Sequence, residues 1–357
     1  MIRSDNEAGM VDLEPVGRPG AADLDTRVAG LDLLTRAVWT LQAAGAQPIV
    51  LRLPNRDLDQ RLASLAAHPR TTATLIGWSC DDPPVASARL LRYDDIRPVA
   101  EIRARPPAPL GPAPPPEEDL ATRAGRERAL GRLLDSCRKP VDGLVARHLN
   151  RRISLAITRR LVDTRLTPHH LTAVTFAVGL AGAAFALDGG YAATATAGVL
   201  MQLGSILDGC DGELARLRFE TSKLGEWLDT LGDDTSNVLF WAAVGIGIAR
   251  RGGHDLLVLA AAVTSIANLV VALLNGLLLR RAGRGDFYVL RERDPEGGPL
   301  RGLVALLGVV LRQDFFLLLV MLLALVGLLH PMMPAFALGA VMTALVSLLR
   351  VLRWSRR

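Results

Sequence analysis

Four aspartates stand at two short spacings in the second half of the chain, which has 357 residues. Asp208 and Asp211 are three residues apart, and Asp229 and Asp233 are four residues apart. In a helix, either spacing places both side chains on one face. The stretch between the two pairs is short, so the two helices can fold against each other. We therefore expect four carboxylates to converge in one pocket.

Carboxylates this close together cannot all ionise unless cations balance them. Hard oxygen ligands at this density suit Mg²⁺ or Mn²⁺, and four carboxylates can hold two ions. A two-metal site is a common solution for phosphoryl chemistry, because the ions clamp the attacking and the leaving oxygens. The pattern predicts a metal site for phosphoryl transfer, with Mg²⁺ or Mn²⁺ as the cofactor.

Small residues and one arginine follow the first acidic pair. Gly212 and Ala215 add no bulk, so a nucleotide or a neighbouring helix can approach the backbone. Arg216 lies about one turn beyond Asp211, and its planar guanidinium offers a fork of donors to a phosphate. The acids and these residues together favour a site for a phosphate-bearing substrate.

The elements that must position these residues are predicted to be membrane helices. Six apolar segments in the second half are each near the length that crosses ~30 Å of hydrocarbon. They are residues 170–187, 191–209, 233–250, 256–279, 315–330 and 334–352. An even number of spans puts the cation-rich stretches on one side, which should be cytosolic. We expect an integral protein of the cytoplasmic membrane, with both termini and the acids on the cytosolic side.

The chain divides by composition into a polar first part and an apolar second part. The proline-rich stretch before residue 118 suits only an extended spacer. Residues 138–165 alternate cations with apolar residues at helical spacing, which favours an interfacial helix over an ordinary solvated one. The expected organisation is a disordered N-terminus (1–26), a small cytosolic α/β domain (27–103), a proline-rich linker (104–118), juxtamembrane amphipathic helices (119–167) and an all-α polytopic membrane domain of six helices (168–357).

Composition argues against two other classes of protein. The three cysteines lie far apart with no CxxC pair, which speaks against a cysteine zinc site. The net charge of +5 would suit nucleic acid, but aromatic residues make up only 4% of the chain and the arginines cluster beside the apolar segments. We expect contact with membrane lipids and no nucleic acid.

The residues around the aspartates resemble the signature of the CDP-alcohol phosphotransferases, which reads DxxDGxxAR, eight residues, GxxxDxxxD. Every fixed position of that signature is filled here, from Asp208 to Asp233. The resemblance implies a six-span membrane enzyme, a CDP-linked donor, an alcohol or inositol phosphate acceptor, and a homodimer. It covers about residues 138–352, and Thr167 to Thr172 also resemble the family's motif before the first span.

The resemblance also implies a role for each residue of the signature. Asp208, Asp211 and Asp229 would ligate metal, while Asp233 would complete the metal site and take the proton from the acceptor hydroxyl. The hydroxyl would attack the phosphorus distal to cytidine, and CMP would leave. The CDP site would be formed by Asp208, Gly212, Ala215, Arg216 and Gly225.

The junction between the two parts resembles a subgroup of this family. Residues 138–151 are similar to the junction in proteins that fuse an inositol-phosphate cytidylyltransferase to a di-inositol-phosphate-phosphate synthase. The N-terminal part departs from that subgroup, because it is short and has no GxGxR-type loop followed by lysine. We interpret it as a degenerate nucleotidyltransferase-like remnant without cytidylyltransferase activity.

Other charged residues have less specific interpretations. An acceptor phosphate or the lipid headgroups would need a basic patch, and the candidates are Arg147, Arg151, Arg152, Arg280 and Arg281. Glu213 lies beside the signature but outside its spacing, so we expect it to be solvated or to stand behind the metal ligands.

Several functions stay open on the sequence alone. The favoured reaction uses CDP-diacylglycerol in phospholipid synthesis, and the alternative makes a soluble product from CDP-inositol and inositol phosphate. A catalytically inactive scaffold that binds CDP or lipid is disfavoured because no aspartate of the signature is missing. A cation transporter would spread its acids along the depth of the bundle, whereas these are clustered.

Overall fold

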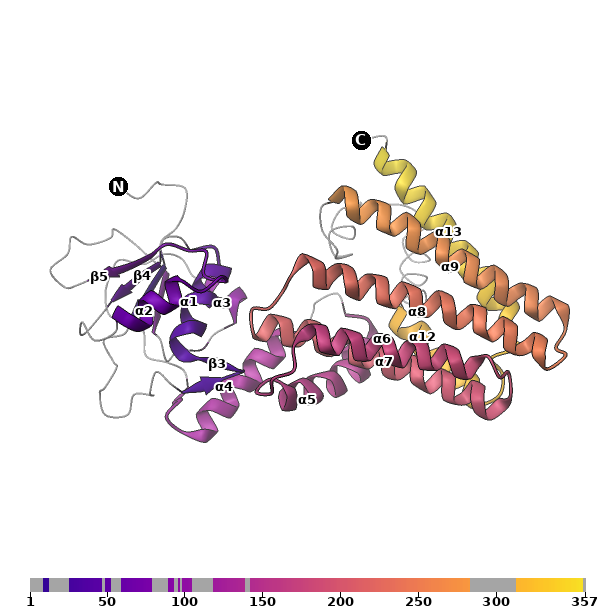
Figure 1. Cartoon of the computed structure of the whole chain (residues 1–357), viewed down its shortest axis with the longest axis horizontal. Helices are drawn as coiled ribbons and strands as arrows, with labels where there is room; N and C mark the ends of the chain where they lie inside the picture. Colours follow the sequence, from indigo (N-terminus) through magenta and orange to yellow (C-terminus); the bar gives the residue numbers. More distant parts are fainter. Residues whose placement is uncertain are drawn as a thin grey trace. The chain divides into compact units, whose positions relative to one another are not determined.

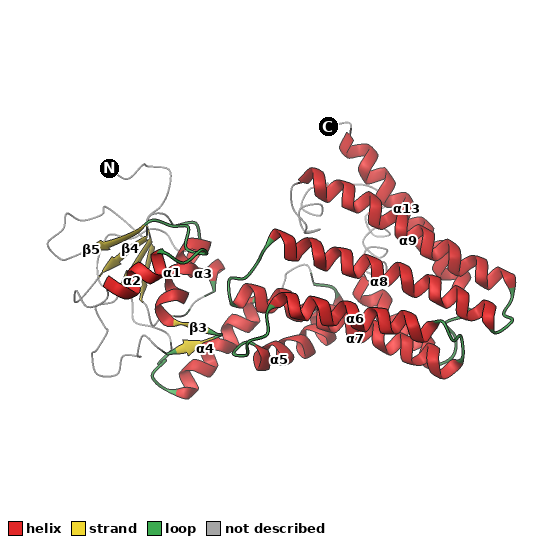
Figure 2. Ribbon diagram, viewed as in Figure 1, coloured by secondary structure: helices red, strands yellow, loops and turns green. Residues whose placement is uncertain are grey.

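The computed structural model describes residues 9–12, 26–46, 49–52, 59–78, 89–92, 96, 98–104, 118–138, 142–282 and 313–355. These residues form two compact units (Figure 1). The first consists of Met1–Arg138 with Val162–Thr164 and Leu217–Phe219, and the second of Lys139–Leu161, Arg165–Arg216 and Glu220–Arg357. Strands occur in the first unit, while the described part of the second is helical (Figure 2).

The first unit is built on a parallel sheet of four strands in the order β5-β4-β1-β6. The strands are β1 (Gly9–Asp12), β4 (Ile49–Arg52), β5 (Leu75–Trp78) and β6 (Arg89–Arg92). Val11 is fully buried and pairs with Leu51 on one side and with Leu91 on the other. The short strands β2 (Arg27–Val28) and β3 (Leu31–Asp32) form a separate antiparallel pair.

Four helices belong to the first unit. They are α1 (Leu33–Ala43), α2 (Asp59–Ala66), α3 (Val99–Ala104) and α4 (Arg123–Ser136). Asp32 caps α1 by accepting a hydrogen bond from the Thr35 N–H. The buried face of α1 contacts β1, β4 and β6, so the sheet and this helix share one apolar core.

Two expectations about the first part of the chain are wrong. The stretch 1–26 contains β1, the strand that β4 and β6 flank, so residues 9–12 are not disordered; residues 1–8 and 13–25 lie outside the described residues. Helix α4 buries Leu133 and Leu134 within the first unit and does not join the juxtamembrane helices, so the unit ends near Arg138. Residues 105–117, which make up most of the expected linker, also lie outside the residues that the structure describes.

The second unit begins with a π-helical turn, η2 (Ala146–Asn150), which continues into α5 (Arg151–Leu161). The long helices that follow are α6 (Pro168–Ala186), α7 (Tyr191–Leu217), α8 (Lys223–Arg250), α9 (Asp255–Ala282), α12 (Gln313–Leu325) and α13 (Met333–Ser355). Each of the six expected apolar segments corresponds to one of these six helices. Helix α8 packs against both α6 and α9, and α9 packs against α13.

Capping residues in the sequence determine where helices α6 and α8 begin. Pro168 occupies the first turn of α6, and Thr167 caps that helix through the His170 N–H. Ser222 caps α8 by accepting a hydrogen bond from the Gly225 N–H. The cap at Ser222 fixes the start of the helix that carries Asp229 and Asp233.

The apolarity of the helices differs from helix to helix. Among the described residues, α6 and the part of α9 from Asp255 to Arg280 are long and apolar enough to cross a membrane. Helices α12 and α13 contain shorter apolar stretches. Helices α7 and α8 do not reach the same apolarity, because acids and hydroxyl or amide side chains interrupt them. The helix positions match the expectation, whereas crossing by all six remains a proposal.

Candidate active site

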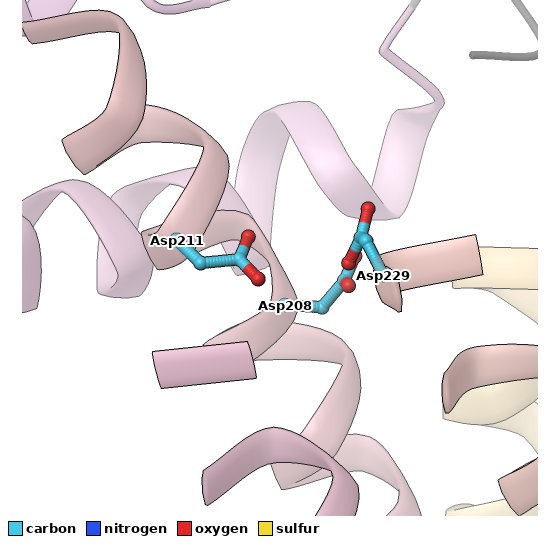
Figure 3. Close-up of side chains that lie close together, drawn as sticks. All are labelled: Asp208, Asp211 and Asp229. Atoms are coloured by element: carbon cyan, nitrogen blue, oxygen red, sulfur yellow. The ribbon is translucent and has the colours of Figure 1, made fainter. Parts of the chain in front are cut away.

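Three of the four signature aspartates lie together in the second unit. Asp208 and Asp211 project from α7 and Asp229 from α8, and one carboxylate oxygen of each lies within 4.8 Å of the others. Figure 3 shows the three carboxyl groups facing one another. Asp211 is only 5% exposed, and Asp208 and Asp229 are half-buried. Three acids in so small a space can all be ionised only if a cation balances them.

The surroundings of these carboxylates fit a hard divalent cation. Oδ1 of Asp208 is buried and has no hydrogen-bond partner, so one lone-pair direction remains open for a ligand. Oδ2 of Asp211 accepts a hydrogen bond of 2.5 Å from the Thr172 hydroxyl of α6, which fixes its orientation. Oxygen donors alone, without cysteine or histidine in the group, suit Mg²⁺ or Mn²⁺.

Asp233 is not a member of this group of three acids. It lies one helical turn beyond Asp229 on α8 and lines the same cavity. Among the described residues, the group of acids close enough to share one ion is therefore Asp208, Asp211 and Asp229, while Asp233 borders the cavities beside it.

Two cavities meet at the acids. The first has a volume of about 370 Å³ and the second about 240 Å³. Thr172, Asp229 and Asp233 line both of them, while Asp208 lines the first and Asp211 the second. A substrate in one cavity and a substrate in the other would thus approach each other across the carboxyl groups.

The second cavity contains most of the residues expected to bind CDP, namely Gly212, Ala215, Arg216 and Gly225. Nε and Nη2 of Arg216 are buried and have no hydrogen-bond partner. A Cβ atom on Gly212 would have only Nη1 of Arg216 within 4 Å, so the space above this glycine is open to a ligand. Unused guanidinium donors beside open space suit a phosphate group.

The first cavity has a polar lining that α5, α7 and α8 share. Asn150 lies on its wall, donates to the Ser205 hydroxyl and accepts from the Gln202 side chain. Asn237 of α8 and Asp314 at the start of α12 complete the polar part, and Asp314 accepts a hydrogen bond from the Ala146 N–H. Such a lining offers both donors and acceptors to a hydroxylated molecule.

The arginines proposed for an acceptor phosphate are not gathered at this cavity. Arg147 of η2, Arg152 of α5 and Arg280 of α9 are exposed, and none of the three lines either cavity. The side chain of Arg281 lies outside the described residues. Arg151 does line the first cavity, but two carboxylates already bind it.

Arg151 keeps its charge in this environment. Burial by itself lowers the pKa of Arg151, but hydrogen bonds and charge from Asp142, and then from Glu213, raise it above its ordinary value. The side chain of Arg151 is 13% exposed. Its positive charge is therefore permanent and is compensated inside the protein.

Glu213 was expected either to be solvated or to stand behind the metal ligands, and the structure excludes the first alternative. It is fully buried and accepts hydrogen bonds from Arg151, Ser154 and Thr158. A signal was present in the sequence. Residues 151, 154 and 158 share one face of α5, and this polar stripe lies on a helix otherwise read as lipid-facing.

The hydrogen bond from Thr172 to Asp211 gives a testable prediction. Thr172→Val keeps the shape of the side chain but removes the donor, leaving Asp211 free to rotate away from the ion. Outer partners of metal ligands typically contribute 10–100-fold to affinity, so we expect Mn²⁺ binding to weaken by about that factor. Titration of Mn²⁺ into the purified protein measures it, with Thr196→Val, an exposed threonine of α7, as the control. Unchanged Mn²⁺ affinity in Thr172→Val would contradict this role.

Comparison with known proteins agrees with this geometry. Residues 165–290 match the family model described as CDP-alcohol phosphatidyltransferase. The matched range contains all three clustered acids as well as Asp233 and the residues of the second cavity.

Similar proteins carry one shared name, "Bifunctional IPC transferase and DIPP synthase". That of Aquifex aeolicus is 39% identical over 127 residues, which is 35% of this chain and 28% of that protein. That of Thermococcus kodakarensis is 49% identical over 92 residues, covering 26% and 20% of the two chains. That of Rubrobacter xylanophilus is 40% identical over 110 residues, covering 31% and 24%.

The matched segments span at most 28% of the length of the relatives named here. The similarity therefore does not show that this chain has the activity of those whole proteins. The match to the family model rests on residues 165–290, where the acids and the second cavity lie. The part of the chain that holds the clustered acids and the second cavity is thus similar to the CDP-alcohol phosphatidyltransferase family.

Proposed function

We propose that the protein is a metal-dependent CDP-alcohol phosphotransferase. It transfers a substituted phosphate group from a CDP-linked donor to an alcohol or inositol phosphate, and CMP is released. One observation carries this proposal: the three clustered carboxyl groups lie where the two cavities meet. The family match and the names of the relatives support an enzyme of this type.

The second cavity would hold the cytidine diphosphate. Its open donors on Arg216 would bind a phosphate oxygen, and the bare backbone at Gly212 would let the diphosphate approach α7. Asp208, Asp211 and Asp229 would hold Mg²⁺ or Mn²⁺, with Asp233 supporting a second ion. Bound metal would neutralise the charge that develops on the phosphate oxygens.

The acceptor hydroxyl would enter through the first cavity. Asp233 lines both cavities, so its carboxylate can take the proton of a hydroxyl that lies against the donor phosphorus. The oxygen then forms a bond to the phosphorus distal to cytidine, the bond from that phosphorus to the bridging oxygen breaks, and CMP leaves. The polar wall at Asn150 and Ser205 would orient a hydroxylated acceptor.

Two donors remain candidates. CDP-diacylglycerol would place the protein in phospholipid synthesis. The name of the relatives, which includes DIPP synthase, favours the second pair, CDP-inositol and an inositol phosphate. The parallel sheet of the first unit is compatible with a nucleotidyltransferase-like remnant, which we propose to be without cytidylyltransferase activity.

We further propose that all six long helices cross the cytoplasmic membrane, with both termini and the site on the cytosolic side. The apolar α6 and α9 support this placement, as do the shorter apolar stretches of α12 and α13. Contact with membrane lipids and assembly into a homodimer are part of the same proposal.

The test uses the full chain purified in detergent with Mg²⁺. CMP release is followed from CDP-diacylglycerol and from CDP-inositol, each offered with a panel of polar alcohols and inositol phosphates. We expect release that requires one donor and one class of acceptor, which names the substrates. CDP binding without CMP release from any pair would point to a substrate outside the panel or to a scaffold; if CDP does not bind, the proposal fails altogether.

A further inference from the structure

The buried carboxylate of Glu213 receives three hydrogen bonds from a single helix. Nη1 of Arg151 and the hydroxyls of Ser154 and Thr158 all donate to it, each over 2.7 Å. Glu213, Ser154 and Thr158 have no exposed surface. A fully buried carboxylate is tolerated only when such donors satisfy it, so this contact fixes α5 to α7 at one defined position.

Arg151 binds a second carboxylate on its other side. Its Nε lies 3.0 Å from Oδ2 of Asp142, and its Nη2 lies 3.4 Å from Oδ1 of the same residue. With Glu213 and Asp142 around it, the guanidinium is an internal counter-ion on the wall of the first cavity. An arginine bound in this way has little capacity left to compensate the charge of a substrate phosphate.

The contact with α5 lies on the side of α7 that faces away from the metal position. At 3.6 residues per turn, Glu213 is rotated by about 140° from Asp208 and by about 160° from Asp211. Gly209 permits the close approach of the two helices. A Cβ atom there would lie 3.1 Å from Nη1 of Arg151 and 3.2 Å from the Ser154 hydroxyl.

We propose that Glu213 and Arg151 are positioning residues for the reaction: their buried ion pair sets the rotation of α7, so that Asp208 and Asp211 face Asp229 on α8. Arg151 is then not a ligand for an acceptor phosphate. The inference rests on the proposed function, because it assigns these residues to the same metal site. It adds two residues that lie outside the spacing of the signature.

A double-mutant cycle with Mn²⁺ as the probe tests this. Arg151→Gln removes the cation that pairs with Glu213 and Asp142, and Glu213→Gln removes the charged acceptor of three donors. We expect each single variant to weaken Mn²⁺ binding, by about 10–100-fold as for outer partners of metal ligands. In the double variant the unpaired charge at Glu213 is gone, so its Mn²⁺ affinity should exceed that of Arg151→Gln.

The acceptor KM separates this proposal from a phosphate-binding role. We expect Arg151→Gln to change metal affinity and kcat while the KM for acceptor stays near that of the unaltered protein. A raised acceptor KM with unchanged Mn²⁺ affinity would overturn the proposal and make Arg151 an acceptor ligand. Additive losses in the double variant would overturn the coupling between the two residues.

Two further variants keep the test decisive. Thr158→Val removes one donor to Glu213 with little change in volume, so a smaller loss of Mn²⁺ affinity in the same direction is expected even if the charge variants fail to fold. Arg251→Gln is the matched control, because Arg251 pairs with Asp188 over the same 2.7 Å but on an exposed surface. Its Mn²⁺ affinity should be unchanged.

Direct Mn²⁺ binding does not depend on knowing the substrates. If the unaltered protein binds Mn²⁺ but releases no CMP from any donor, the proposed function fails while the cycle still decides the positioning role. Equal Mn²⁺ affinity in the unaltered protein, Arg151→Gln, Glu213→Gln and Thr158→Val would refute the positioning role whatever the enzyme assay gives.

Discussion

Asp229→Asn is expected to abolish detectable metal-dependent CMP release and to weaken Mg²⁺ binding by more than about 100-fold. Loss of an outer partner of a metal ligand already costs 10–100-fold, and Asp229 is the only one of the three clustered acids that α8 supplies. The substitution keeps the size of the side chain and removes one negative charge. Mg²⁺ titration followed by thermal unfolding measures the effect, because a bound ion raises the stability of the folded state.

The same variant has an opposite effect on the metal-free protein. Without a cation, carboxyl groups within 4.8 Å of one another either repel or must take up protons, and both lower the stability of the empty site, so replacing one of them with an amide relieves that cost. We expect Asp229→Asn to unfold at a higher temperature than the unaltered protein in chelator and to gain nothing when Mg²⁺ is added. Asp255→Asn, at an exposed acid in the first turn of α9, is the control and should keep both CMP release and the response to Mg²⁺. A normal Mg²⁺ response in Asp229→Asn would contradict the metal site.

Asp233→Asn should lower kcat by about 10²–10⁴-fold, the usual contribution of a positioned general base, while metal binding is largely retained. The reason is geometric. Asp233 lines both cavities but lies outside the group of three acids, so we expect its carboxylate to act on a substrate more than on the ion. Steady-state kinetics with saturating Mg²⁺ measures kcat, and Mn²⁺ titration of the same sample measures the affinity for metal.

The comparison of the two variants decides the role of Asp233. Retained Mn²⁺ affinity with a collapsed kcat identifies a base. If Asp233→Asn loses Mn²⁺ as completely as Asp229→Asn, Asp233 is mainly a metal ligand and this prediction is wrong. The pH dependence of kcat gives a second test. If Asp233 is the base, the decrease in kcat at acidic pH that the unaltered protein shows should be absent in Asp233→Asn.

The arrangement of the acids could be predicted from the sequence because helical spacing determines it. Asp208 and Asp211 at three residues, and Asp229 and Asp233 at four, must share faces of their helices, and a short connection brings the helices together. The helix positions followed from apolar segments in the same way. What spacing does not determine is distance across helices, so the structure was needed to distinguish Asp233 from the other three.

Strand β1 was missed because nothing local identifies it. Gly9–Asp12 is only four residues long, and its place between β4 and β6 depends on partners that begin at Ile49 and Arg89. Parallel pairing of this kind is set by contacts distant in sequence, which a local pattern does not contain. The same reason explains α4, whose leucines are buried within the first unit.

The burial of Glu213 could not be predicted for a different reason. A charged residue next to the signature could be solvated or stand behind the metal ligands, and a buried charge is costly without partners. Its partners Arg151, Ser154 and Thr158 lie more than fifty residues earlier in the chain and are joined to it only by the packing of α5 on α7. The polar stripe on α5 can be recognised in the sequence, but its contact with Glu213 on α7 cannot.

The most direct test of the central claim is the nucleotide released when Mg²⁺ is added to the full chain with donor and acceptor. Metal-dependent attack on the phosphorus distal to cytidine predicts CMP, formed in equal amount with the phosphodiester, absent in chelator and restored by Mg²⁺. Release of CDP in place of CMP would place the broken bond elsewhere. CMP release that persists undiminished after metal removal would contradict the role given to Asp208, Asp211 and Asp229.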